Sequence, residues 1–117
     1  MVFNNLQQLL EENKLILMEA AIVEQLRRSS DVQLHDTLVN ATLIYEESGR
    51  QALAKLYQDY IDIAKASALP FIMCTPTWRA NHYRVSCSNI SLTINIDAAK
   101  FMRNIRDTPS KVEQRGR

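Results

Sequence analysis

Two short apolar runs, at residues 15–18 and 71–74, are separated by a long stretch that is mostly helical in pattern. Short apolar runs bounded by turn signals are typical of buried strands. Residues 50–67 form the clearest helix between them, with apolar residues recurring at three and four positions until Pro70 ends the pattern. A strand, a helical connection and a second strand make a βαβ unit, so the sequence predicts two parallel strands joined by a crossover.

Other segments of the chain also have helical character. Asn4 or Asn5 is placed to cap a first helix, residues 20–28 and 34–45 continue with helical spacing, and Asp97 is placed to cap a helix over residues 98–105. Gly49 follows the second of these segments. Because glycine lacks a Cβ, we expect it to end that helix in a left-handed conformation.

The length and composition limit the class of protein. A chain of 117 residues, with 46% hydrophobic and 23% charged residues, is expected to form a single domain. A net charge of +1 gives no reason to expect a nucleic acid or a membrane as partner. No apolar run has the ~20 residues of a membrane span, and no secretory signal is evident. The two cysteines form no disulfide framework, so we expect a reducing, cytoplasmic setting.

The candidate site follows the second apolar run. Ligands of parallel α/β sheets bind beyond the carboxyl ends of the strands. The hydrogen-bonding and amphipathic residues at this position are Thr75, Thr77, Trp78, Arg79 and Asn81. An ordinary polar turn after a buried strand explains the same pattern equally well.

Glu19 occupies the matching position after the first run. If the two strands are parallel neighbours, its carboxylate faces the same opening and can accept hydrogen bonds from a ligand ammonium. Alternatively, Glu19 is an acid favoured by the dipole at the start of a helix. Trp78 and Arg79 can stack on a planar ligand, or Trp78 covers the end of the sheet while Arg79 pairs with Glu19.

The sequence lacks the residue patterns typical of metal binding, of acid–base catalysis and of phosphate binding. Cys74 and Cys87 have no further ligands at zinc spacing, so we expect no metal site in this chain. His35 and His82 are lone histidines without a nucleophile or carboxylate at a predictable distance. The chain has two glycines and no glycine-rich phosphate loop. No catalytic residue is predicted.

Residues 14–28 and 53–68, and above all the Thr-Pro-Thr-Trp-Arg-Ala-Asn segment at 75–81, resemble the N-terminal part of the homocysteine S-methyltransferase family. In that family the first strand runs into Asp-Gly-Ala-Met-Gly-Thr-Glu-Leu, and the second strand carries Thr-Asn-Thr-Tyr. Glu19 stands at the position of the family's aspartate, which meets the substrate amino group. Thr75 and Thr77 match the two threonines, and Trp78 replaces the aromatic residue. Ala20 and Val23 replace the glycines.

The resemblance implies an α/β fold made of the N-terminal βα units of a (β/α)8 TIM barrel, incomplete in this chain. Residues 1–106 are the barrel segment and residues 107–117 a disordered tail of a truncated or trimmed protein. The family transfers a methyl group to the thiol of homocysteine, giving methionine, and uses a zinc ion held by cysteines of late strands. The implied partners are homocysteine and a methyl donor. The implied substrate contacts are Glu19 and the 75–81 loop, with no methyl transfer by this chain alone.

Two other hypotheses remain open at this point. Two parallel strands leave open edges, through which a small α/β interaction module can associate with itself. A product without a selected function is the third hypothesis.

Overall fold

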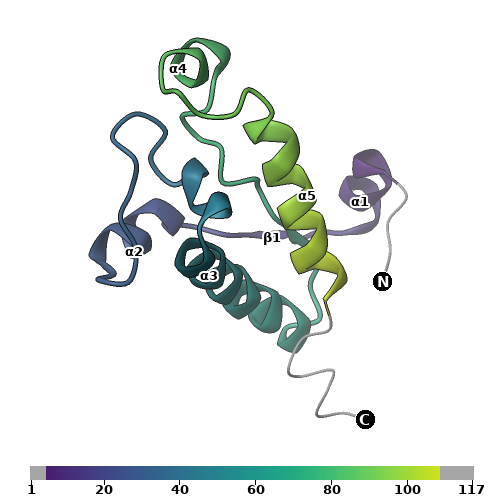
Figure 1. The fold of residues 1–117 in the computed structure, drawn as a ribbon. Helices are drawn as coiled ribbons and strands as arrows, with labels where there is room; N and C mark the ends of the chain where they lie inside the picture. The colour runs from purple at the N-terminus through teal and green to yellow at the C-terminus, as the bar shows by residue number, and fades with distance from the viewer. Residues whose placement is uncertain (1–4, 109–117) are drawn as a thin grey trace.

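The structure, a computed structural model, describes residues 5–108 of the chain. Two very short strands and a mostly helical remainder make up the fold (Figure 1). In chain order the elements are α1 (Leu6–Glu12), β1 (Leu17–Met18), α2 (Ile22–Arg28), the 3-10 helix η1 (Ala41–Tyr45), α3 (Glu47–Ala66), β2 (Phe71–Ile72), α4 (His82–Ser86) and α5 (Ile94–Asp107). Asn5 caps α1, as predicted, by accepting a hydrogen bond from the amide of Gln8 at 2.8 Å.

The two strands are parallel neighbours, which confirms that part of the prediction. Leu17 is in register with Phe71 and Met18 with Ile72, and the Leu17 amide donates to the Pro70 carbonyl at 2.9 Å. Each strand is only two residues long, although the apolar runs have four. In this register the Cys74 amide would continue the ladder to the Glu19 carbonyl. It donates instead to the Glu19 side chain at 2.8 Å, so the pairing stops there.

The predicted barrel fold is wrong for the part of the chain that the structure describes. A (β/α)8 barrel repeats strand and helix in sequence, whereas residues 5–108 contain a single pair of strands. Between β2 and Thr108 the chain forms α4 and α5 and supplies no third strand. Residues 90–94, whose alternation imitates a strand, lead into α5 and bury Ile94 against helices.

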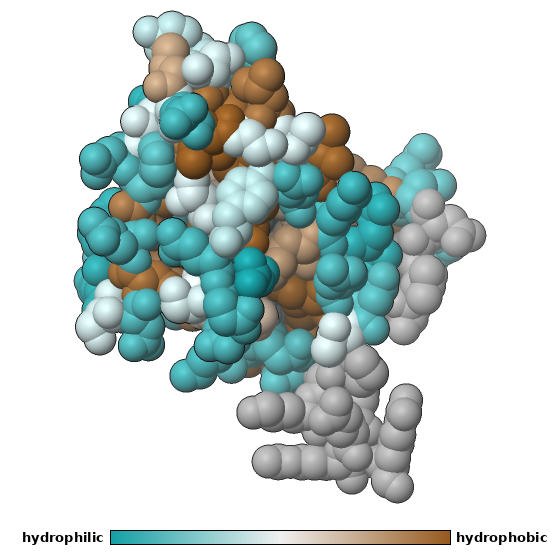
Figure 2. All heavy atoms as spheres, viewed as in Figure 1, coloured by the Kyte–Doolittle hydropathy of each residue, from teal (hydrophilic) through white to brown (hydrophobic). Residues whose placement is uncertain are grey.

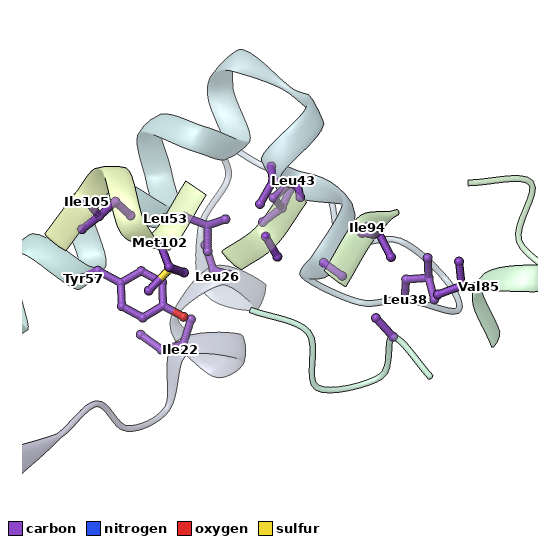
Figure 3. Packing of buried hydrophobic residues seen from close by; sticks show 14 residues of the cluster. Ile22, Leu26, Leu38, Leu43, Leu53, Tyr57, Val85, Ile94, Met102 and Ile105 are labelled. Carbon is purple, nitrogen blue, oxygen red and sulfur yellow. The ribbon is translucent and has the colours of Figure 1, made fainter. Parts of the chain in front are cut away.

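The core is helical and lies where α3, η1 and α5 meet (Figure 3). Leu53 and Tyr57 of α3 are at most 1% exposed, and Leu43 of η1 and Ile94 of α5 are fully buried. Ile22 and Leu26 of α2 join the same cluster. Helix packing therefore supplies most of the buried apolar surface, and the strand pair lies at the margin of this core.

Gly49 does not end a helix, contrary to the prediction. It is the third residue of α3, is buried, and has no positive φ. A Cβ at this position would lie 2.3 Å from the Leu43 carbonyl oxygen and 2.8 Å from the Leu43 Cα. The glycine is therefore required by the close approach of η1 to the start of α3, rather than by its conformational freedom.

The segment predicted as helix at 34–45 is helical only over η1. Before it, the chain makes a tight loop in which His35 and Val39 exchange both backbone hydrogen bonds, at 2.9 and 3.0 Å. The His35 Nδ1 accepts from the amides of Thr37 and Leu38 at 3.1 and 3.0 Å. Because a side chain satisfies these amides, the loop has no need of helical hydrogen bonds.

The last helix begins earlier than predicted, at Ile94 rather than after Asp97. Asp97 lies in its first turn and accepts hydrogen bonds from the Tyr45 hydroxyl at 2.5 Å and the Thr93 hydroxyl at 3.0 Å. The helix includes Asp107, the first residue of the predicted tail at 107–117, and residues 109–117 lie outside the described part. None of the helices between residues 5 and 108 is long and apolar enough to cross a bilayer.

Candidate functional site

An open cleft of about 450 Å³ lies beyond the carboxyl ends of the two strands, at the place where parallel sheets bind ligands. We call it the β1/β2 cleft. Its lining residues are Glu19, Ala21, Ile22, Val23, Glu24, Arg27, Asn40, Tyr57, Cys74, Thr75, Pro76 and Trp78. They come from the connection between β1 and α2, from α2 itself, the end of the 31–40 loop, α3 and the segment after β2. The predicted meeting of Glu19 with the residues after β2 therefore occurs.

A second hollow, of about 430 Å³, lies between the C-terminal half of α3, β2 and the end of α5. Its lining is mostly apolar, its charged residues are the cations Lys65 and Arg106, and no carboxylate is among its lining residues. Specific small-molecule sites combine apolar walls with a few converging polar groups. The β1/β2 cleft combines a carboxylate, a buried amide and hydroxyl groups with its apolar walls, and we therefore treat it as the candidate site.

Glu19 is the central polar residue of the cleft. One carboxylate oxygen, Oε1, accepts the Cys74 amide hydrogen at 2.8 Å and so joins the ends of β1 and β2. The other, Oε2, is buried and has no hydrogen-bond partner among the described residues. An unsatisfied buried acceptor is costly, at roughly 1–3 kcal/mol and more for a charged group. The carboxylate is thus held in place with one acceptor left for a donor.

The charge of Glu19 affects two neighbours. Burial raises the pKa of the Tyr57 hydroxyl above its ordinary value, and the charges of Glu19 and Cys74 raise it further. Burial likewise raises the pKa of the Cys74 thiol, and the neighbouring Glu19 carboxylate adds to the effect. Both groups therefore stay protonated at neutral pH. The Tyr57 hydroxyl donates to the Cys74 carbonyl at 3.0 Å.

The two predicted threonines hold the loop after β2 in shape. The hydroxyls of Thr75 and Thr77 are 2.7 Å apart and hydrogen-bonded, and the Thr77 amide donates to the Thr75 carbonyl at 2.8 Å. Thr75 lines the β1/β2 cleft, whereas Thr77 does not. Thr77 therefore acts on the cleft through Thr75.

Trp78 and Arg79 resolve one of the open alternatives. The Arg79 guanidinium lies over the Trp78 ring, 4.3 Å from its centre, whereas the Glu19 carboxylate accepts its hydrogen bond from the Cys74 amide. Trp78 lines the cleft but remains 64% exposed, so it does not seal the end of the sheet. A flat or apolar part of a ligand can still pack against it.

Asn81 caps a helix and does not contribute to the cleft. Its side-chain oxygen accepts the Arg84 amide hydrogen at 2.9 Å and caps α4. It does not line the β1/β2 cleft. Of the six predicted site residues, the cleft therefore contains Glu19, Thr75 and Trp78.

Among the cleft residues that sequence reasoning missed, two are buried and polar. Asn40 is only 2% exposed, and its Oδ1 is the other buried side-chain atom without a hydrogen-bond partner among residues 5–108. Tyr57 falls on the apolar side of α3 by its spacing, yet its hydroxyl donates to the Cys74 carbonyl. No spacing or motif marks Asn40, because it follows an irregular loop. For Tyr57 the only signal is its hydroxyl, since a tyrosine on an apolar helix face needs a hydrogen-bond partner when it is buried.

The donor set does not fit a zinc site. Residues 5–108 contain no group of three or more histidine, cysteine or acidic side chains able to hold a metal ion. The Cys74 thiol also has a raised pKa, whereas a zinc ligand must be a thiolate.

Comparisons of this chain with protein-family models, with curated proteins and with solved structures found no match. The geometry of the β1/β2 cleft is therefore the basis for a functional assignment.

Proposed function

We propose that the β1/β2 cleft binds the ammonium group of a small α-amino acid. The observation that carries the proposal is the Glu19 carboxylate, fixed by the Cys74 amide and left with a second oxygen that is buried and unpartnered. A carboxylate only accepts hydrogen bonds, and its bond to a charged donor is roughly twice as strong as a neutral bond. A protonated amine supplies both the donor and the compensating charge.

Arg27 offers a partner for the carboxylate of the same ligand. It lines the cleft and pairs with Glu24 at 2.9 Å, and Glu24 also pairs with Arg28 at 3.0 Å. Arg27 can therefore turn toward a ligand while Glu24 keeps a cationic partner. An amino acid would then be bound at both of its charged groups, with its side chain near Trp78.

The sequence resemblance suggests homocysteine as this amino acid. We limit the proposal for this chain to binding, because no donor set in residues 5–108 fits the zinc that activates the thiol in the homocysteine S-methyltransferase family. The methyl donor and the transfer step are then outside what this chain does alone. We also propose a reducing compartment such as the cytoplasm, since Cys74 and Cys87 are both exposed and unpaired.

The test is a titration with L-homocysteine in the presence of a non-thiol reductant, read from the fluorescence of Trp78, the single tryptophan of the chain. We expect saturable binding to the wild type and binding that is about 10- to 100-fold weaker for Glu19→Gln, because a charged hydrogen bond is lost. Glu12→Gln, on the exposed side of α1, is the matched control and should bind as the wild type does. Equal affinity of the wild type and Glu19→Gln would refute the proposal.

Glu19→Gln keeps an acceptor for the Cys74 amide, so the fold should survive the change. A separate measurement shows that the charge alone has been removed. In a Cys87→Ser background, Glu19→Gln should move the pH midpoint for alkylation of Cys74 to lower pH. The reason is that the negative charge of Glu19 raises the pKa of this thiol in the wild type. An unchanged midpoint would mean that Glu19 does not lie against the thiol.

A second candidate function is self-association through the open sheet edge. β1 pairs only with β2 among the described strands, and the Met18 side chain of β1 is 53% exposed. Sedimentation would then give a defined dimer, and Met18→Lys should convert it to a monomer because a lysine disfavours edge pairing. Apolar side chains also reach the surface near the start of α5, where Leu92 and Ile96 are exposed (Figure 2). A dimer that persists in Met18→Lys would exclude the strand edge as its interface.

A further inference from the structure

Asn40 is the second polar side chain of the β1/β2 cleft with an unmet hydrogen bond. Its side chain is almost completely buried, at 2% exposure of the residue, and it lines the cleft that contains Glu19. Its Oδ1 has no partner within residues 5–108. Native proteins satisfy the large majority of such atoms, so a buried unpartnered amide oxygen on a cleft wall calls for an explanation.

The backbone around Asn40 is fixed on both sides. Val39, directly before it, has a φ of 56°, a left-handed conformation that a β-branched residue rarely adopts. The paired backbone hydrogen bonds between His35 and Val39 hold that conformation. After Asn40, η1 begins, and the Asn40 carbonyl accepts the Leu43 amide hydrogen at 3.3 Å. The side chain is therefore held against the cleft by an ordered loop.

We propose that Asn40 Oδ1 and Glu19 Oε2 accept hydrogen bonds from one ligand ammonium, so that the cleft selects a primary amine over a tertiary or quaternary one. The proposal rests on the proposed function and extends it from one acceptor to two. Both oxygens are buried, so the cleft wall must open locally before a ligand can reach them.

The selectivity follows from the number of N–H bonds. A primary ammonium has three, enough for both oxygens and one further partner. A dimethylated ammonium has a single N–H bond, which can satisfy Glu19 or Asn40 but not both. A trimethylated ammonium has none and would leave both oxygens unpaired at the added cost of desolvating them. Methylation of the ligand nitrogen should therefore weaken binding even though the positive charge remains.

The experiment compares L-methionine with N,N-dimethyl-L-methionine, which differ only at the nitrogen and carry no thiol. We expect the wild type to bind L-methionine at least tenfold more tightly, again read from Trp78 fluorescence. Asn40→Ala should weaken the binding of L-methionine about tenfold and leave the affinity for the dimethylated ligand within about twofold of the wild type. The preference for the primary amine is then lost. A loss of equal size for both ligands, as expected of a residue that only maintains the loop, would overturn the proposal.

Asn40→Asp provides a second variant in case the alanine variant unfolds. It keeps the shape and an acceptor oxygen, so it should retain tight binding of L-methionine and the preference for the primary amine. If Glu19→Gln weakens L-methionine while Asn40→Ala does not, the role of Asn40 is wrong and the proposed function stands. If the wild type binds neither ligand, or if Glu19→Gln changes nothing, both fail.

Discussion

Tyr57→Ala should lower the free energy of unfolding by about 4 kcal/mol, the largest loss that we expect from any single substitution in this chain. The tyrosine is 1% exposed and its ring lies in the cluster that joins α3 to α2 and α5 (Figure 3). Removing the ring leaves a cavity beneath the β1/β2 cleft that the surrounding helices cannot fill without leaving their own contacts. Chemical denaturation followed by circular dichroism measures the change.

Tyr57→Phe is the matched control. It keeps the buried ring and removes only the hydroxyl that donates to the Cys74 carbonyl at 3.0 Å. We expect a loss of about 1 kcal/mol, because Cys74 is exposed and its carbonyl can turn to solvent. If the phenylalanine variant loses as much free energy of unfolding as the alanine variant, the hydrogen bond between Tyr57 and the segment after β2 contributes more than the packing of the ring.

Gly49→Ala should lower the free energy of unfolding by about 3 kcal/mol, even though alanine is the better helix former. The added Cβ would lie 2.3 Å from the Leu43 carbonyl oxygen and 2.8 Å from the Leu43 Cα, and both are backbone atoms. Backbone cannot rotate away as a flexible side chain can, so η1 must move off α3. The melting temperature should fall by roughly 10–20 °C, measured by calorimetry.

Ser48→Ala, at the preceding and exposed position of α3, serves as the control for Gly49→Ala. It introduces the same residue without a steric conflict, so we expect a change within about 0.5 kcal/mol. A stabilising effect of Gly49→Ala would mean that η1 and α3 are not packed as closely as the structure has them.

The elements that depend on local pattern could be predicted from the sequence. The repeat of apolar residues in α3, the Asn5 cap of α1 and the parallel pairing of the two apolar runs are all present. These features are set by residues that are close in sequence or by a long connection that favours the parallel arrangement. The barrel was wrong because a likeness over two βα units does not specify a third strand. Residues after β2 bury their apolar side chains in helices instead.

The misassigned parts depend on specific contacts that apolar periodicity does not encode. His35 satisfies the amides of its loop with its own ring nitrogen, which no periodicity reveals. Glycine is typical of helix ends, but at position 49 it is required because the Leu43 backbone lies too close to leave room for a Cβ. For the site, the rule that ligands bind beyond the carboxyl ends of parallel strands was enough to predict Glu19, Thr75 and Trp78 as cleft residues. Asn40 could not be found, because a buried asparagine without a partner is visible only once the whole loop is folded.

The most direct test of the ammonium site compares L-homocysteine with 4-sulfanylbutanoate on the wild-type chain. The two ligands share the thiol and the carboxylate and differ only in the amino group. We expect saturable binding of L-homocysteine and affinity at least tenfold lower for the amine-free ligand, measured by calorimetry with a non-thiol reductant present. Equal affinity for both ligands, or tighter binding of 4-sulfanylbutanoate, would contradict an amine-binding role for Glu19.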